Sequence, residues 1–266
     1  MSKFVVVVFP SESAAYEGTR ALKQLHAEGS LTLYGMAVLA KEASGRIAIK
    51  QAADQGALGT AVGTLVGGLV GLAAGPVGGA LGMGAGALMG GIGDLFDMGI
   101  RSDFLEAISK KLTEGKAAVV AEVDEDWMKP LDVAMEPLGG QVIRQWRSDF
   151  EAEQIDAIAK ERKAELAELK AEFDRAGGEA KKTLSKRLDE TRAKLDAAGK
   201  RAEAKQRQFE QESDAKAAAL QRQIEQANAE TKARIEKRVT AMKADFKRRR
   251  ELLKQAWNMT KDALAA

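Results

Sequence analysis

The chain contains no cysteine and only one histidine, His26, and these absences narrow the chemistry open to it. Without cysteine there is no disulfide framework, no thiolate zinc site and no cysteine nucleophile. A histidine-rich metal site or a serine–histidine–aspartate triad would have to be built around His26 alone. That residue lies near the end of an expected helix, where a surface or helix-dipole role is the ordinary one. We therefore expect no enzyme, no catalytic residue, no metal and no cofactor.

Aromatic residues are also scarce, at 5%, and neither sign of charge dominates. Lys and Arg number 41 against 39 Asp and Glu, a net charge of +2, which rules out a strongly basic nucleic-acid-binding protein as the default class. Glycine is the exception to this sparseness, with 26 residues. At 266 residues the chain is long enough for one or two domains with a sizeable core.

Two stretches, 1–50 and 101–147, repeat the order strand, helix, strand. In the first, Ser11 is a suitable N-cap for a helix that Gly29 ends. In the second, Asp124 or Asp126 is expected to cap a helix that reaches Met135. A further amphipathic helix over 102–112 would cover the sheet. The expected strands are 4–9, 31–39, 46–50, 117–123 and 141–146. Two such units on one sheet predict an α+β fold, a ferredoxin-like sandwich.

The insertion between these halves, 51–100, has no charged residue between Asp54 and Asp94. Pro76 divides it into two arms of about 18 residues, each about 27 Å as a helix and so close to the roughly 30 Å thickness of the bilayer core. Glycines at every fourth position predict close helix packing in lipid, with apolar side chains such as Val62, Leu65 and Leu69 facing the lipid. The predicted element is a glycine-zipper transmembrane hairpin. Its packing glycines are Gly59, Gly63, Gly67, Gly71, Gly75, Gly78, Gly82, Gly86 and Gly90.

Three alternatives compete with the transmembrane hairpin. The glycine helices would equally suit burial inside a protein oligomer. A flexible glycine-rich linker is less consistent with Leu and Val at helical spacing. A nucleotide-binding loop lacks a preceding strand and a GK[ST] sequence.

The remaining stretch, 148–266, has no proline and is rich in helix-forming residues. Its sparse apolar residues recur every 11 positions, a period that gives nearly straight or right-handed helix packing. We predict a long charged amphipathic helix or coiled coil that packs against copies of itself, with breaks at Gly177–Gly178 and at Gly199. A solvated, partly disordered tail is the alternative. The predicted packing residues are Phe173, Leu184, Leu195, Phe209, Leu220, Ile224 and Ile235.

Basic residues gather near the end of this tail and alternate there with apolar ones. A basic amphipathic segment with a tryptophan is typical of a surface that binds anionic lipid. A nucleic-acid patch and a solvated helix end are the alternatives. The lipid-surface candidates are Lys243, Phe246, Lys247, Arg248, Arg249, Arg250, Lys254 and Trp257.

The interrupted sandwich, followed by GIRSDFLEAISKKLTEGKAAVVAEVDEDW and LGGQVIRQ, resembles an uncharacterised bacterial and archaeal family of predicted membrane proteins with a domain of unknown function. The resemblance covers roughly 3–147 and leaves the long tail as an addition. It implies a membrane protein and brings no catalytic motif.

These patterns together predict a structural protein that assembles into a homo-oligomeric ring, shell or cage. The hairpin would anchor it in the cell inner membrane, and both halves of the sandwich would face the cytoplasm, because no export signal is evident. Its partners would be further copies of itself and membrane lipids. An oligomeric pore or channel is one alternative, although 55–93 carries few polar side chains to line an ion path. A small-ligand sensor is another, by analogy of fold alone.

Overall fold

The computed structural model describes residues 2–52, 56–73, 100–147 and 150–265, which form two compact units. The α+β unit comprises Met1–Ser148 and Glu212–Lys243. The helical unit comprises Asp149–Gln211 and Ala244–Ala266. Five glycines of the predicted zipper lie outside the described residues: Gly75, Gly78, Gly82, Gly86 and Gly90.

The α+β unit is built on a five-stranded sheet in the order β3-β2-β4-β1-β5, with every neighbouring pair antiparallel. Without the edge strand β3, the order β2-β4-β1-β5 and the helical crossovers from β1 to β2 and from β4 to β5 give the ferredoxin-like arrangement. The α+β fold class is therefore confirmed. The strands are β1 (Lys3–Phe9), β2 (Leu31–Lys41), β3 (Ile47–Gln51), β4 (Ala117–Glu125) and β5 (Gln141–Trp146).

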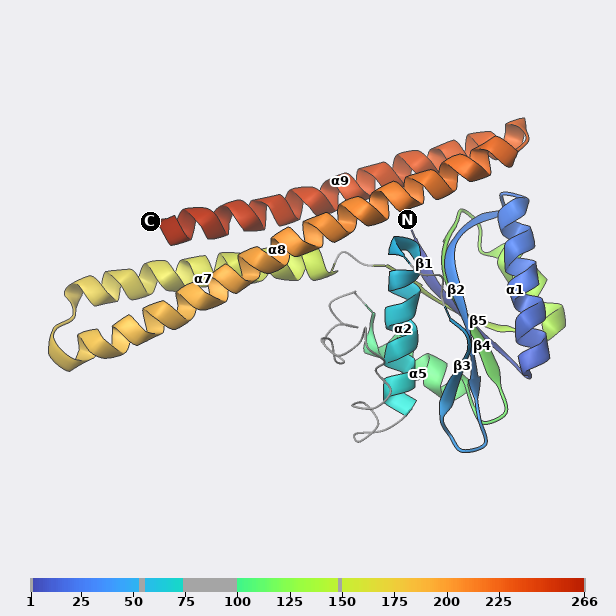
Figure 1. Ribbon diagram of the computed structural model, residues 1–266, viewed down its shortest axis with the longest axis horizontal. Helices are drawn as coiled ribbons and strands as arrows, with labels where there is room; N and C mark the ends of the chain where they lie inside the picture. Colours follow the sequence, from blue (N-terminus) through green and yellow to red (C-terminus); the bar gives the residue numbers. More distant parts are fainter. Residues whose placement is uncertain (1, 53–55, 74–99, 148–149, 266) are drawn as a thin grey trace. The chain divides into compact units, whose positions relative to one another are not determined.

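Helices cover both faces of this sheet, and the alternation of β1 supplies the two apolar surfaces. The helices α1 (Glu12–Ala27) and α6 (Lys129–Met135) pack on the face that includes Val5 and Val7. The helices α2 (Ala57–Ala73) and α5 (Ser102–Lys111) pack on the face that includes Phe4 and Val6. Figure 1 shows α1 and α2 on opposite sides of the sheet. We call these the α1 face and the α2 face.

The helix α2 lies within the segment predicted to be a transmembrane hairpin, yet its apolar side packs on the α2 face of the sheet. Val62, Leu65 and Leu69 are buried there, although lipid was their expected environment. The contact is close at Gly35 of β2, where an added Cβ would lie 3.1 Å from the Leu58 carbonyl oxygen. Within the parts of the chain that the structure describes, no helix has both the length and the apolar character to cross a membrane.

The start of α6 differs from the sequence prediction. The strand β4 extends to Glu125, so Asp124 belongs to the strand, and the N-cap of α6 is Met128, which makes no side-chain cap bond. The prediction that Asp124 or Asp126 caps this helix is wrong. The short 3-10 helix η1 (Glu136–Leu138) and Gly139 in the left-handed region then lead into β5.

The tail forms three helices, α7 (Phe150–Arg175), α8 (Gly178–Gln226) and α9 (Ala229–Ala265). The break before Gly178 agrees with the prediction, whereas α8 continues as one helix through Gly199, where a bend or break was predicted. An added Cβ on Gly199 would lie 2.7 Å from Cγ2 of Thr260, so this glycine permits close approach of α9. A second break precedes α9, and Asn228 caps that helix by accepting a 2.9 Å bond from the Thr231 amide.

Candidate functional site: a charged junction between sheet and helices

On the α2 face, the side chains of β4 change from apolar to acidic halfway along the strand. Ala118 and Val120 belong to the apolar core, but the next residues on the same face are Glu122 and Asp124. Glu122 is only 1% exposed. A buried carboxylate requires compensating charges and hydrogen bonds, so its partners identify what this half of the sheet contacts.

The partners of Glu122 come from two distant parts of the α+β unit. Oε1 of Glu122 accepts a 2.6 Å bond from Nζ of Lys216 on α8 and a 3.0 Å bond from Nη1 of Arg147, just after β5. Glu212, one turn before Lys216, binds Arg147 through both carboxylate oxygens and lies 2.9 Å from Lys216. Lys216 also donates to the Ser2 hydroxyl at 3.2 Å. We call Glu122, Arg147, Glu212 and Lys216 the Glu122 cluster.

The surroundings within the Glu122 cluster favour the charged forms of Glu122, Glu212 and Arg147. Burial alone would raise the pKa of Glu122, but Lys216 and Arg147 lower it below the usual value. Burial opposes ionisation of Glu212 as well, and Arg147 and Lys216 lower its pKa strongly. Conversely, Glu212 and Glu122 outweigh the effect of burial and raise the pKa of Arg147. All of these shifts lead away from neutrality, whereas a general acid or base works best with a pKa near 7.

A second polar group, the Thr32 cluster, comprises Thr32, Asp126, Gln223 and Arg238. The Thr32 hydroxyl donates a 2.7 Å bond to Oε1 of Gln223 and accepts a 3.2 Å bond from Nη1 of Arg238. Arg238 also binds Oδ2 of Asp126, at 2.7 Å from Nη2 and 3.1 Å from Nε. Asp126 therefore forms an ion pair with α9 instead of capping α6.

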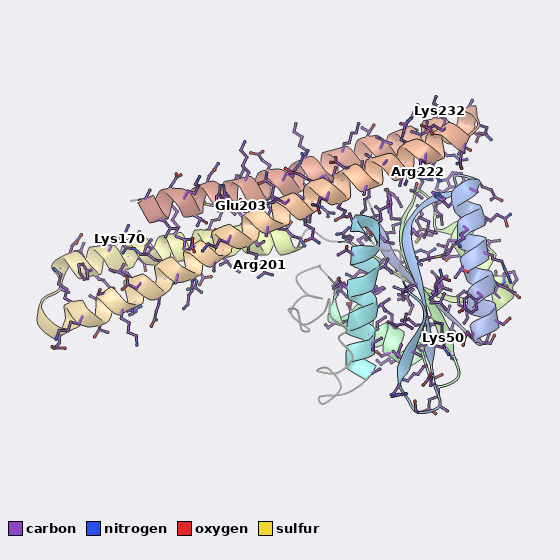
Figure 2. All side chains as sticks on the ribbon, in the orientation of Figure 1. Lys50, Lys170, Arg201, Glu203, Arg222 and Lys232 are labelled. Carbon is purple, nitrogen blue, oxygen red and sulfur yellow. The ribbon has the colours of Figure 1, made fainter. Side chains whose placement is uncertain are left out.

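Gln223 of α8 and Arg238 of α9 also bind the backbone around the turn between α1 and β2. Gln223 donates to the carbonyl oxygens of His26 and Leu31, at 2.6 and 2.8 Å. Arg238 donates to those of Gly29 and Ser30, at 3.1 and 3.2 Å. Three of these carbonyl groups belong to the turn and the start of β2, and that of His26 also accepts a bond from the Gly29 amide. Figure 2 labels Arg222 near the end of α8 and Lys232 near the start of α9.

Two further residues, Tyr34 and His26, lie beside the two clusters. We call the Glu122 cluster, the Thr32 cluster and these two residues the junction. Tyr34 lies where the register between β2 and β4 shifts, and its ring is 4.7 Å from the Lys216 nitrogen. Its buried hydroxyl has no hydrogen-bond partner among the described residues, and burial, with Asp124 and Glu122 nearby, raises its pKa. His26 accepts a 3.2 Å bond from the Leu33 amide at Nδ1. Burial and the charge of Arg238 lower the pKa of His26.

A third ion-pair group lies on the α1 face, at the edge strand β5. Arg144 binds Glu125 of β4 at 2.7 Å and Asp132 of α6 at 2.7 Å. Glu125 is shared with Lys3, whose nitrogen also lies 4.2 Å from the ring centroid of Trp146. This group ties α6 and both neighbouring strands to β5.

The residues predicted to pack helices lie mostly within the chain's own folded units. Gly59 is buried, whereas an added Cβ on Gly63, Gly67 or Gly71 would meet no atom of the described residues within 4 Å. The predicted tail residues belong to two units. Leu220, Ile224 and Ile235 belong to the α+β unit, and Phe173, Leu184, Leu195 and Phe209 belong to the helical unit. In the latter, Leu195 packs with Leu166, Leu169, Leu188 and Ala263, and Phe173 and Leu184 flank this core.

Three of the eight predicted lipid-surface residues, Phe246, Arg249 and Trp257, are buried or half-buried in the helical unit. Phe246 makes an edge-to-face contact with Phe209, with ring centroids 6.1 Å apart, and Arg249 is bound to Asp245 at 2.6 Å. Trp257 is half-buried beside Gly199. The exposed members are Lys243, Lys247, Arg248, Arg250 and Lys254. Figure 2 labels Lys170 on α7 and Glu203 on α8, two further charged residues of the helical unit.

The sequence prediction missed the junction altogether. One signal was present, because Glu122 interrupts an otherwise apolar strand at a position that alternation assigns to the buried face. Its partners could not be read from the sequence, since Arg147, Glu212 and Lys216 lie outside the 11-residue apolar pattern of the tail.

Comparison with known proteins gives one match, over residues 58–161, to a family described as "Protein of unknown function (DUF1269)". The match runs from α2 through β5 into α7, whereas the resemblance noted in the sequence covered roughly 3–147. No curated protein and no solved structure matches the chain. Over the matched stretch, the chain is similar to a family whose function is uncharacterised.

Proposed function

We propose that the protein is a non-catalytic structural protein that acts as a homo-oligomeric scaffold. The observation that supports this role is the Glu122 cluster. Its four charged side chains neutralise one another at the contact between the sheet and the α8–α9 pair. Buried ion pairs with defined geometry constrain how two elements fit together more than they stabilise them. The cluster therefore suits a scaffold subunit, in which the α8–α9 pair must be held on the five-stranded sheet in one orientation.

Membrane attachment, with the soluble domains on the cytoplasmic face of the cell inner membrane, stays a prediction from the sequence of 51–100. The apolar side of α2, which is part of this segment, is occupied by the sheet. The proposed scaffold role does not depend on lipid. Self-association and lipid binding are therefore tested separately.

The decisive experiment measures the mass of the full chain in solution by light scattering after size-exclusion chromatography, with and without a mild detergent. A scaffold gives a defined multiple of the 28.5 kDa chain mass in at least one of the two conditions. A monomer in both conditions over the accessible concentration range contradicts the scaffold and favours a ligand sensor. Flotation with vesicles of neutral and of anionic lipid, on the same preparation, tests the predicted attachment.

A further inference from the structure

The edge strand β5 presents a set of backbone groups that no described strand pairs with. It lies at the end of the sheet order and is hydrogen-bonded only to β1 among the strands described. The Arg147 amide donates to the Ser2 carbonyl at 3.1 Å, so Arg147 is at a position whose backbone groups are directed toward β1. In an antiparallel pair hydrogen-bonded and non-hydrogen-bonded positions alternate, so the N–H and C=O groups of Val142, Arg144 and Trp146 are directed away from β1.

The side chains at this edge are unusually apolar for a surface. Trp146 is 58% exposed, and Met128 and Val133 are more than half exposed. Met128 and Val133 lie next to Arg144. This arginine binds the Met128 carbonyl at 3.2 Å and the carboxylate of Asp132, the residue before Val133. An unpaired strand edge bordered by exposed apolar side chains is a typical protein interaction surface.

We propose that β5 pairs antiparallel with β5 of a second copy of this chain, about a twofold axis at Arg144. This inference rests on the proposed self-association and names the surface that produces it. In this register the outward groups of Arg144 face those of Arg144 in the second copy. Val142 then lies directly opposite Trp146 of the other copy, and the same contact occurs again on the other side of the axis.

The chemistry of the strand favours its own copy as the occupant. An isologous contact needs a self-complementary surface, and pairing Val142 with Trp146 sets a β-branched side chain against an aromatic one, a favourable cross-strand pair. The two Arg144 side chains would meet near the axis. Each is already bound to two carboxylates, Glu125 and Asp132, so the pairing does not bring two uncompensated positive charges together.

The first test compares two substitutions of exposed apolar residues on opposite edges of the same sheet. Trp146→Lys removes the proposed contact and adds a charge, whereas Ile49→Lys does the same on β3, where Ile49 is 50% exposed. Analytical ultracentrifugation of the full chain should show the dissociation constant raised about tenfold or more by Trp146→Lys and unchanged by Ile49→Lys. Circular dichroism checks that both variants are folded.

A second test reads the register and holds even if Trp146→Lys fails to fold. Because the chain has no cysteine, single substitutions Val142→Cys and Trp146→Cys introduce unique thiols. Directly paired residues would have Cα atoms about 5.5 Å apart, within disulfide range. Under oxidising conditions the mixture of the two variants should form a disulfide-linked dimer, whereas neither variant alone should do so.

The possible outcomes separate this inference from the proposed function. An oligomer that persists unchanged in Trp146→Lys, together with no cross-link in the mixture, overturns β5 pairing but leaves the scaffold role intact. A wild-type chain that is monomeric in buffer and in detergent overturns both. A cross-link in either single variant alone shows that the strands meet in a different register and overturns the axis at Arg144.

Discussion

Nζ of Lys216 lies 2.6 Å from Oε1 of Glu122, although 94 residues separate them along the chain. Both side chains are almost completely buried, so neither charge has water as an alternative partner. This pair, with Arg147 and Glu212, is what joins the charged half of the sheet to α8.

Removing one charge from this cluster should destabilise the protein severely. We expect Glu122→Gln to lower the free energy of unfolding by about 3–5 kcal/mol, because it leaves the bases in excess in a buried site. The double variant Glu122→Gln/Lys216→Met should cost less than the sum of its two single variants, since it removes one acid and one base together. Urea unfolding followed by circular dichroism measures both quantities.

A matched control for this experiment is Glu17→Gln. Glu17 forms an exposed pair with Arg20 on α1, at 3.9 Å, and its loss should change stability by no more than about 0.5 kcal/mol. Equal losses in Glu122→Gln and Glu17→Gln would show that the cluster does not hold the unit together.

The same cluster predicts the acid sensitivity of the fold. The pKa values of Glu122 and Glu212 are lowered in the folded state, so the unfolded chain binds protons more readily. Their contribution to stability is therefore fully present above their ordinary pKa of 4.5 and is lost as the pH falls through the folded values. The free energy of unfolding should fall more steeply below about pH 4.5 in the wild type than in Glu122→Gln, and parallel curves would contradict this.

His26 offers a clean titration, because it is the only histidine in the chain. Burial and Arg238 lower its pKa, so NMR should place it below 6.5. Its contribution to stability is present above pH 6.5 and is lost as the pH falls, since protonation of Nδ1 breaks the bond from the Leu33 amide. Arg238→Gln should raise the pKa of His26 and Arg238→Lys should not. The same shift in both variants would rule out the charge of Arg238 as a cause.

The packing of α9 against the α1–β2 turn is tested at Gly29. Its φ is +72°, and an added Cβ would lie 2.0 Å from Cγ2 of Thr231. Gly45 has a φ of +81° with nothing within 4 Å, so Gly45→Ala should cost only the left-handed strain of about 1–2 kcal/mol. Gly29→Ala should cost clearly more, and Thr231→Ser should remove that excess. Equal thermal shifts in the two alanine variants would show that α9 does not pack here.

The open glycine side of α2 gives a test of the predicted zipper. Gly67→Ala adds a Cβ that meets nothing within 4 Å in the parts of the chain that the structure describes, so the helix should gain about 0.5–1 kcal/mol. Gly35→Ala, whose Cβ would lie 3.1 Å from the Leu58 carbonyl, is the destabilising comparison. If Gly67→Ala instead reduces the mass of the assembly without unfolding it, this side of α2 packs against another helix, as the zipper predicts.

The elements of the α+β unit could be predicted because each has a local signal. Ser11 caps α1 with a 3.2 Å bond from the Ala14 amide, and the alternation of RIAIK agrees with β3. The junction could not be predicted, since its bonds join residues that are close only in the folded state. The apolar side of α2 was the most ambiguous signal, because a helix buried on a sheet and a helix in lipid require the same side chains.

The distance along the chain between the partners of the junction has a consequence for synthesis. A ribosome completes all five strands by Trp146, but Glu212 and Lys216 follow only after another 60 or so residues, and Arg238 later still. Until then Arg147 is the only member of the Glu122 cluster that can pair with Glu122. The acidic half of β4, on the α2 face, still lacks its contact with α8. Long-range contacts of this kind are formed late and slowly. The nascent chain therefore completes this domain only after Arg238 has been synthesised, and truncation before residue 212 should leave a sheet that cannot finish folding.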